Sequence, residues 1–156
     1  MSPADTIVAV SSAPGTGLRA LVRVSGDRAF LAMLHALGAS VPQRRGVHAT
    51  TLAVPAQQHG TVRCAAWVVV LPGPNSFTGQ DTLELALPAN TALVERVVAA
   101  LTSQSGVRLA QPGEFTARAF LAGRMTLEQA EGVAAFIAAQ HEEQLDAARD
   151  LKAGVV

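Results

Sequence analysis

The stretch QPGEFTARAFLAGRMTLEQAE at residues 111–131 predicts two successive helices. In the first, Pro112 lies near the opening turn, where its missing N–H group costs no helical hydrogen bond. The negative charge of Glu114 suits the positive end of a helix dipole. Gly123 then interrupts the apolar pattern, so we predict that the first helix ends close to this residue.

The second helix has a clear start signal. Thr126 stands three residues before Gln129, which is the spacing of a capping box. The alanine-rich segment that follows continues towards Lys152 without a strong helix breaker until Gly154. We therefore predict a single helix over residues 127–152, about 39 Å long at 1.5 Å per residue.

The preceding 110 residues alternate between strand-like and helix-like patterns. Apolar residues at positions 30, 31, 34 and 37 follow the i, i+3, i+4, i+7 spacing of an amphipathic helix. Asn90 is a candidate N-cap for another helix. Turns are expected at residues 14–17 and 57–60, and the second turn favours an antiparallel hairpin. The predicted strands are residues 6–11, 18–24, 47–54, 62–71 and 82–87, and the predicted helices are 27–38 and 90–103.

The run CAAWVVVL at residues 64–71 is almost entirely apolar. Such a run is typical of a strand that is buried on both faces, so we predict a central strand covered by helices on both sides. Cys64 is the only cysteine, which excludes a disulfide within one chain and a cysteine metal site. We expect it to be a small buried hydrophobic residue.

The composition is 49% hydrophobic and 15% charged, with 12 basic and 12 acidic residues. A neutral, charge-poor surface favours self-association. Lys152 is the only lysine, and the basic pair Arg44 and Arg45 is expected in a loop, so the chain is not expected to bind a polynucleotide by itself. The N-terminus has no signal-peptide pattern, and no apolar run is long enough to span a membrane. A cytoplasmic protein is the expectation.

Nucleotide-binding signatures are missing from the sequence. No G-x-x-x-x-G-K-[ST] occurs, which excludes a GTPase site of the P-loop type in this chain. Gly15 and Gly17 do not form a dinucleotide-binding pattern because Ala20 occupies the third glycine position, and a turn is the better interpretation. No nucleotide or metal site is therefore expected.

Four blocks of the sequence together resemble one family. They are DTIVA at residues 5–9, VRVSG at 22–26, PGPNSFTGQDTLEL at 72–85, and the stretch at 111–131. In this order, and over nearly the whole chain, they resemble the N-terminal domain of the MnmE (TrmE) family of tRNA modification GTPases. The resemblance implies an α+β fold: a mixed β-sheet packed by helices, like the folate-binding aminomethyltransferases, with a long C-terminal helix.

The resemblance also implies a function and a domain organisation. Residues 1–126 would form a folate-binding, dimer-forming domain, and residues 127–156 a helix leading toward a helical and GTPase region. The implied cofactor is a tetrahydrofolate derivative, either 5-formyl- or 5,10-methylene-tetrahydrofolate. The implied partners are a second copy of the chain and, through the full-length protein, a flavin-dependent protein that takes part in wobble-uridine modification. This chain would bind and orient, and it would not catalyse alone.

Folate recognition needs a flat apolar slot, a carboxylate for the N–H edge of the pterin, and cations for the glutamate tail. The resemblance assigns folate contacts to Arg23, Glu84 and Arg124, the last at a position where the family usually has lysine. A carboxylate such as that of Glu84 can accept two parallel hydrogen bonds from the pterin. The alternatives are, for Glu84, a surface glutamate on an edge strand and, for Arg23, a strand arginine whose stem packs on the sheet.

Three further residues are weaker candidates. Phe77 and Phe115 are predicted in loops or at helix starts, where either could form an aromatic wall of a pocket or pack in the core. Arg118 lies one turn after Glu114. For an arginine at this spacing, an ion pair within the helix is a more frequent role than contact with a ligand.

Two departures from the family pattern put folate binding in question. Gln80 replaces an acid, and residues 87–90, LPAN, replace a glycine-rich segment. A second hypothesis follows: an interaction module that keeps the dimerising fold and has lost folate binding. A third, a one-carbon transferase of related fold, is weaker because no residue for proton transfer stands out among the scattered histidines, which are His35, His48, His59 and His141.

Overall fold

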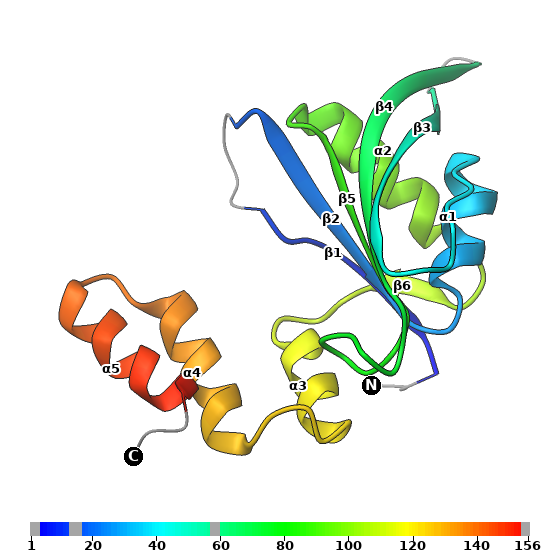
Figure 1. The fold of residues 1–156 in the computed structure, drawn as a ribbon. Coiled ribbons are helices and arrows are strands. Elements are labelled where there is room, and N and C mark those ends of the chain that lie inside the picture. Colours follow the sequence, from blue (N-terminus) through cyan, green and yellow to red (C-terminus); the bar gives the residue numbers. More distant parts are fainter. Residues whose placement is uncertain (1–3, 13–16, 57–59, 154–156) are drawn as a thin grey trace. The chain divides into compact units, whose positions relative to one another are not determined.

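The computed structural model describes residues 4–12, 17–56 and 60–153 (Figure 1). The turns predicted at 14–17 and 57–60 lie largely outside the described residues. The elements in chain order are β1 (Thr6–Val10), β2 (Arg19–Ser25), α1 (Ala29–Leu37), β3 (Gly46–Pro55), β4 (Thr61–Leu71), β5 (Thr82–Pro88), α2 (Thr91–Thr102), β6 (Val107–Leu109), α3 (Glu114–Leu121), α4 (Leu127–Ala138) and α5 (Glu142–Ala153).

The chain divides into two compact units. The first contains Met1–Ser76 and Gln80–Ala110, and the second contains Phe77–Gly79 and Gln111–Val156. The division does not test the predicted domain boundary after residue 126, which stays a prediction.

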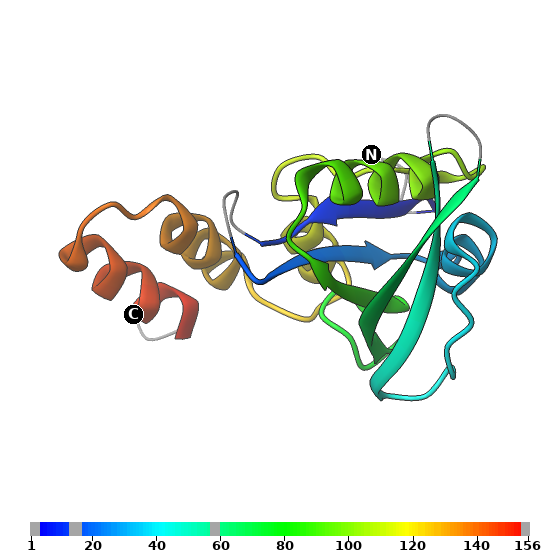
Figure 2. The ribbon, with the colours of Figure 1, turned by 90° about the horizontal axis from the view of Figure 1, so that it is seen from above.

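The first unit is built on a mixed six-stranded sheet with the order β3-β4-β5-β2-β1-β6. All neighbouring strands are antiparallel except β1 and β6, which are parallel. Viewed from above, the β3–β4 pair runs across the direction of β1 and β2, so the sheet is strongly twisted (Figure 2). The predicted α+β class with a mixed sheet is confirmed. Strand β6 was not predicted, because three residues are too few for a periodic pattern.

Helices α1 and α2 cover one face of this sheet (Figure 1). The hydrophobic core lies between these helices and the sheet, and the strand residues that enter it follow a period of two. In β5, for example, Leu83, Leu85 and Leu87 are fully buried, whereas Glu84 and Ala86 between them are half-buried. The side chain of Glu84 therefore lies on the face opposite α1 and α2, which we name the outer face.

The prediction that residues 64–71 are buried on both faces is wrong. Strand β4 does lie between two other strands, β3 and β5. Its burial alternates, however: Cys64, Ala66, Val68 and Val70 are buried, and Trp67 is 48% exposed on the outer face. The run reads as apolar because both sets of alternating positions carry apolar side chains, although only one set enters the core. The expectation that Cys64 is buried is confirmed.

The second unit contains α3 and a hairpin of α4 and α5. The predicted single helix over residues 127–152 is wrong, because Ala139 takes an extended conformation after α4. The chain then reverses, and the Gln140 N–H group donates to Oε1 of Gln144 at 2.9 Å. Gly132 makes the close packing of the two helices possible, because a Cβ atom at this position would lie 2.4 Å from the backbone nitrogen of Lys152.

The two predicted helix caps are confirmed, whereas the helix predicted from residue 27 begins at Ala29. The Asn90 side chain accepts a hydrogen bond from the Leu93 N–H group at the start of α2. Thr126 and Gln129 form the capping box of α4, with both reciprocal hydrogen bonds present. Among the described residues, no helix combines the length and the apolar character that a membrane crossing requires.

Candidate functional site

The register of the sheet brings two of the predicted folate residues together. Arg23 of β2 lies directly opposite Glu84 of β5. The Nε atom of Arg23 donates to Oε1 of Glu84 at 2.6 Å, and one terminal nitrogen lies 2.5 Å from the same oxygen. The two side chains are 31% and 21% exposed, so a ligand at the outer face can reach both charged groups.

A hydrogen-bonded junction next to this pair fixes the ends of both strands. The hydroxyl groups of Ser25 and Thr82 lie 2.9 Å apart and are buried. One residue further, the Gly26 N–H group donates to the Asp81 carbonyl at 2.9 Å. Because these contacts tie the end of β2 to the start of β5, they hold Arg23 and Glu84 in register.

The loop at residues 72–81 is ordered by its own polar groups. Oδ1 of Asp81 accepts from the Gly73 N–H group at 2.9 Å. The carbonyl of Gln80 accepts from the Ser76 hydroxyl and, at 3.2 Å, from Thr82 Oγ1. These bonds use the backbone carbonyl of Gln80 and tie the loop to the start of β5.

The second departure from the family pattern also serves the fold. Leu87 is fully buried, and Asn90 is the N-cap of α2. Within residues 87–90, Leu87 therefore supplies core packing and Asn90 a helix cap.

The other predicted residues belong to the second unit. Arg124 is exposed, and its Nε atom lies 3.7 Å from the position that a Cβ on Gly79 would occupy, so it lies against the loop that carries Phe77. Phe77 is 39% exposed, and Phe115, in the first turn of α3, is half-buried.

Arg118 forms the helical ion pair that its spacing predicts. Its terminal nitrogen donates to Oε1 of Glu114 at 3.0 Å, and the two residues are 7% and 1% exposed. Oε2 of Glu114 also accepts from the Gln111 N–H group at 2.9 Å. The pair thus joins the first turn of α3 to the preceding chain, which favours the scaffolding interpretation of Arg118.

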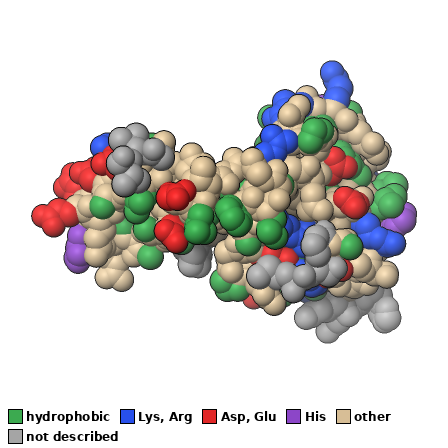
Figure 3. Space-filling model, turned by 90° about the horizontal axis from the view of Figure 1, so that it is seen from below, with side chains coloured by type: hydrophobic (Ala, Val, Ile, Leu, Met, Phe, Trp, Pro, Cys, Tyr) green, Lys and Arg blue, Asp and Glu red, His purple; other side chains and the backbone are tan. Residues whose placement is uncertain are grey.

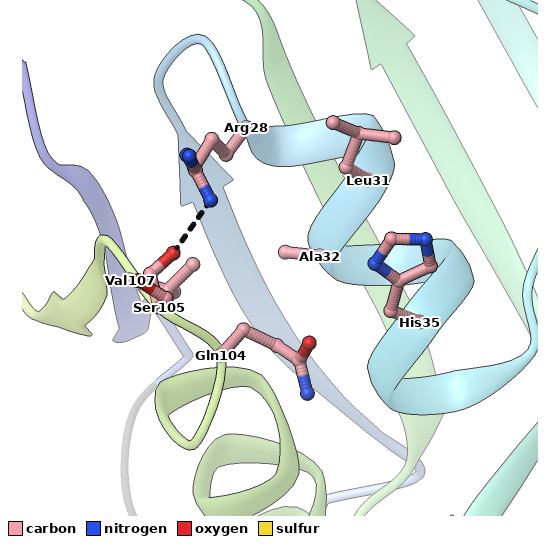
Figure 4. A pocket seen from close by; sticks show the side chains of 7 residues that line it. All are labelled: Arg28, Leu31, Ala32, His35, Gln104, Ser105 and Val107. Carbon is pink, nitrogen blue, oxygen red and sulfur yellow. Dashed lines mark hydrogen bonds between the residues drawn. The ribbon is translucent and has the colours of Figure 1, made fainter.

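Two concave regions contain none of the predicted residues. A pocket of about 220 Å³ lies between α1 and the turn before β6 (Figure 4). In it, the Arg28 guanidinium donates to the Ser105 carbonyl at 3.0 Å, and His35 and Gln104 line the opening. Its volume is below the roughly 300–1,000 Å³ usual for ligand sites. The second is a groove of about 350 Å³ on the α4–α5 hairpin, lined mainly by alanines.

The charge distribution separates the hairpin from the rest of the described chain. Acidic side chains gather over it in the space-filling view (Figure 3). Residues 127–153 contain six acidic residues and only two basic ones, Arg149 and Lys152. No group of three or more His, Cys, Asp or Glu side chains that could hold a metal ion is found within residues 4–12, 17–56 and 60–153.

Sequence reasoning missed one feature of the outer face, the exposed Trp67. It assigned this residue to a doubly covered strand, whereas the side chain lies on the same face as Arg23 and Glu84. Trp67 stands between Ala66 and Val68, which are buried on the opposite face of the strand. Because all three residues are apolar, the sequence alone does not show that the face of Trp67 is uncovered.

Comparison with known proteins gives a consistent family assignment. Residues 6–124 match the family described as "GTP-binding protein TrmE N-terminus". The chain is 41% identical over 140 residues to the tRNA modification GTPase MnmE of Dinoroseobacter shibae and 43% identical over 141 residues to that of Novosphingobium aromaticivorans, covering 90% of this chain in each case. It is 37% identical over 155 residues to the MnmE of Pectobacterium atrosepticum, which covers 99% of this chain. The matches span 31–33% of the length of these three relatives.

Proposed function

Because the chain belongs to the family of TrmE N-terminal domains of the tRNA modification GTPase MnmE, we propose that it is a tetrahydrofolate-binding, homodimerising domain that serves wobble-uridine modification. The folate would be a 5-formyl or 5,10-methylene derivative that supplies a one-carbon unit. A flavin-dependent protein would join the full-length protein in the modification. The domain itself would bind and orient the folate.

The observation that carries the proposal is the Arg23–Glu84 pair on the outer face. Glu84 presents a partly exposed carboxylate, and Arg23 fixes its direction through two contacts to Oε1. The amino and ring N–H groups of a pterin form a donor edge that matches a carboxylate, and such charge-assisted hydrogen bonds are directional and strong. Both residues lie in sequence blocks that match the family.

Other features fit this proposal. The neutral, charge-poor composition favours homodimer formation. The acidic character of the α4–α5 hairpin disfavours direct contact with tRNA phosphates, so tRNA would be held by other parts of the full-length protein. Arg124 is kept as a predicted contact because its exposed guanidinium can pair with a carboxylate.

The test is isothermal titration of the chain with 5-formyltetrahydrofolate, after light scattering has established the oligomeric state. Loss of a hydrogen bond to a charged group is worth about 1.5–3 kcal/mol, so Glu84→Ala should weaken binding by at least about tenfold. Glu95→Ala is the matched control, since it removes an exposed glutamate from α2 and should leave the affinity unchanged. Absence of heat with the unchanged chain at saturating ligand would refute folate binding.

The second candidate function is a dimerising module without a ligand. The observation in its favour is that Leu87 is committed to the core and Asn90 to the cap of α2. A dimer in light scattering, together with no folate heat, is the result that this alternative predicts.

A further inference from the structure

We propose that Trp67 is the stacking surface for the flat ring of the ligand that Arg23 and Glu84 bind. The inference rests on the proposed folate function and adds a residue to that site. Trp67 lies outside the four sequence blocks that resemble the family, so its role follows from the structure alone.

The sheet register places Trp67 next to the charged pair. Glu84 lies opposite Arg23 on one side and opposite Val69 on the other, and the next residue on the same face of β5, Ala86, lies opposite Trp67. Trp67 is thus the diagonal cross-strand neighbour of Glu84. Diagonal neighbours in a sheet are about 7–8 Å apart at their Cα atoms, within reach of an aromatic side chain.

Small neighbours leave the indole accessible. The residues opposite Trp67 on the two adjoining strands are both alanines, Ala49 on β3 and Ala86 on β5, and Ala65 precedes it on the same face. The side chain of Trp67 is 48% exposed although tryptophan is among the most apolar surfaces a protein can present. A flat ring can therefore lie against the indole without meeting a bulky side chain from either neighbouring strand.

The chemistry of the pair and of the indole selects the same ligand class. Glu84 accepts hydrogen bonds from a donor edge, Arg23 can donate to a ring carbonyl, and an indole face stacks on a planar heteroaromatic ring. A 2-amino-4-oxo pyrimidine fused to a second ring, as in a pterin, has all three features. A purely aliphatic or purely anionic ligand would use only part of this arrangement.

Trp67 also provides its own assay. It is the only tryptophan of the chain, and the chain has no tyrosine. Fluorescence excited at the indole band therefore reports on this residue alone. Titration with 5-formyltetrahydrofolate should quench the Trp67 emission with the same dissociation constant as the heat measured by calorimetry.

Three variants complete the experiment. Stacking of a ring on an aromatic side chain corresponds to a loss of about 5- to 140-fold in affinity on replacement by alanine, which is the expectation for Trp67→Ala. Trp67→Phe keeps an aromatic face and should stay within about threefold of the unchanged chain. Val47→Ala is the matched control: Val47 is 61% exposed on the same face, but β4 separates it from Glu84, so its folate affinity should not change.

The outcomes separate the inference from the proposed function. Folate heat that Glu84→Ala removes and Trp67→Ala leaves intact overturns the stacking role while the folate site stands. Absence of heat with the unchanged chain overturns the proposed function and, with it, the role of Trp67. If Trp67→Ala and Val47→Ala both dissociate a dimer and neither alters folate affinity, a second copy of the chain covers the indole and the inference is wrong.

Discussion

Replacing Gly26 by alanine should destabilise the fold at the junction that holds the candidate site. Gly26 has a φ of 140°, a conformation that L side chains rarely adopt. A Cβ atom at this position would lie 2.6 Å from the Thr6 Cα atom and 2.5 Å from its Oγ1 atom. The Thr6 backbone cannot move away easily, since its N–H group is bonded to the Gly106 carbonyl at 2.9 Å.

The magnitude follows from three contributions. Unfavourable backbone geometry costs roughly 1–3 kcal/mol. Forcing an extra carbon into filled space costs a further 1–3 kcal/mol or so. The lower entropy of alanine in the unfolded chain offsets about 0.4–1 kcal/mol. The free energy of unfolding should therefore fall by roughly 1–5.5 kcal/mol, which for a chain of this length lowers Tm by about 2–22 °C.

Urea unfolding followed by far-UV circular dichroism measures this change. Gly60→Ala is the matched control, because Gly60 has a φ of 103° but no atom within 4 Å of a Cβ placed there. It should show the backbone cost alone, about 0–2 kcal/mol after the unfolded-state offset. If Gly26→Ala is no more destabilising than Gly60→Ala, then the close approach of Gly26 to Thr6 does not exist and the argument fails.

Two further predictions concern the hairpin and the thiol. Gly132→Ala places a Cβ atom 2.4 Å from the Lys152 backbone nitrogen and should separate α4 from α5, which would be measured as faster amide hydrogen exchange in the hairpin. Gly123→Ala is the control, because its Cβ meets no atom within 4 Å, and it should leave the exchange of α4 and α5 unchanged. Equal exchange in the two variants would contradict the packing. Burial raises the pKa of the Cys64 thiol despite the opposing charge of Arg19, so the stability that the protonated thiol contributes is complete below the ordinary thiol pKa and is lost as pH rises through the raised value. Reaction with a disulfide reagent should consequently be slower than for a free thiol at the same pH and rise at higher pH, and a rate equal to that of an unfolded control would refute the burial.

The elements that could be predicted from the sequence are those with local causes. The capping box of Thr126 and Gln129 and the N-cap Asn90 depend on side chains within one turn of their targets, and both helix starts are where the sequence places them. The hairpin of β3 and β4 likewise joins two strand-like segments that are adjacent in the sequence. In each case the information lies within a few residues.

The elements that could not be predicted depend on contacts distant in sequence. The reversal after α4 has no proline or glycine at the break, and the close packing that accompanies it joins Gly132 to Lys152, twenty residues later. For the candidate site, the sequence supplied Arg23 and Glu84 through motifs, but their pairing requires the register of β2 on β5, across 61 positions.

The error at β4 carries information about function. An apolar residue in a strand indicates that its side chain is more stable away from water. It does not indicate whether the chain itself, a ligand or another molecule covers that side chain. At Val68 and Val70 the chain does so, because α1 and α2 pack over that face. At Trp67 the described chain leaves about half of the side chain in contact with solvent. The apolar pattern at Trp67 departs from burial on the face that also carries the partly exposed Arg23–Glu84 pair, and such departures are expected where a protein binds something.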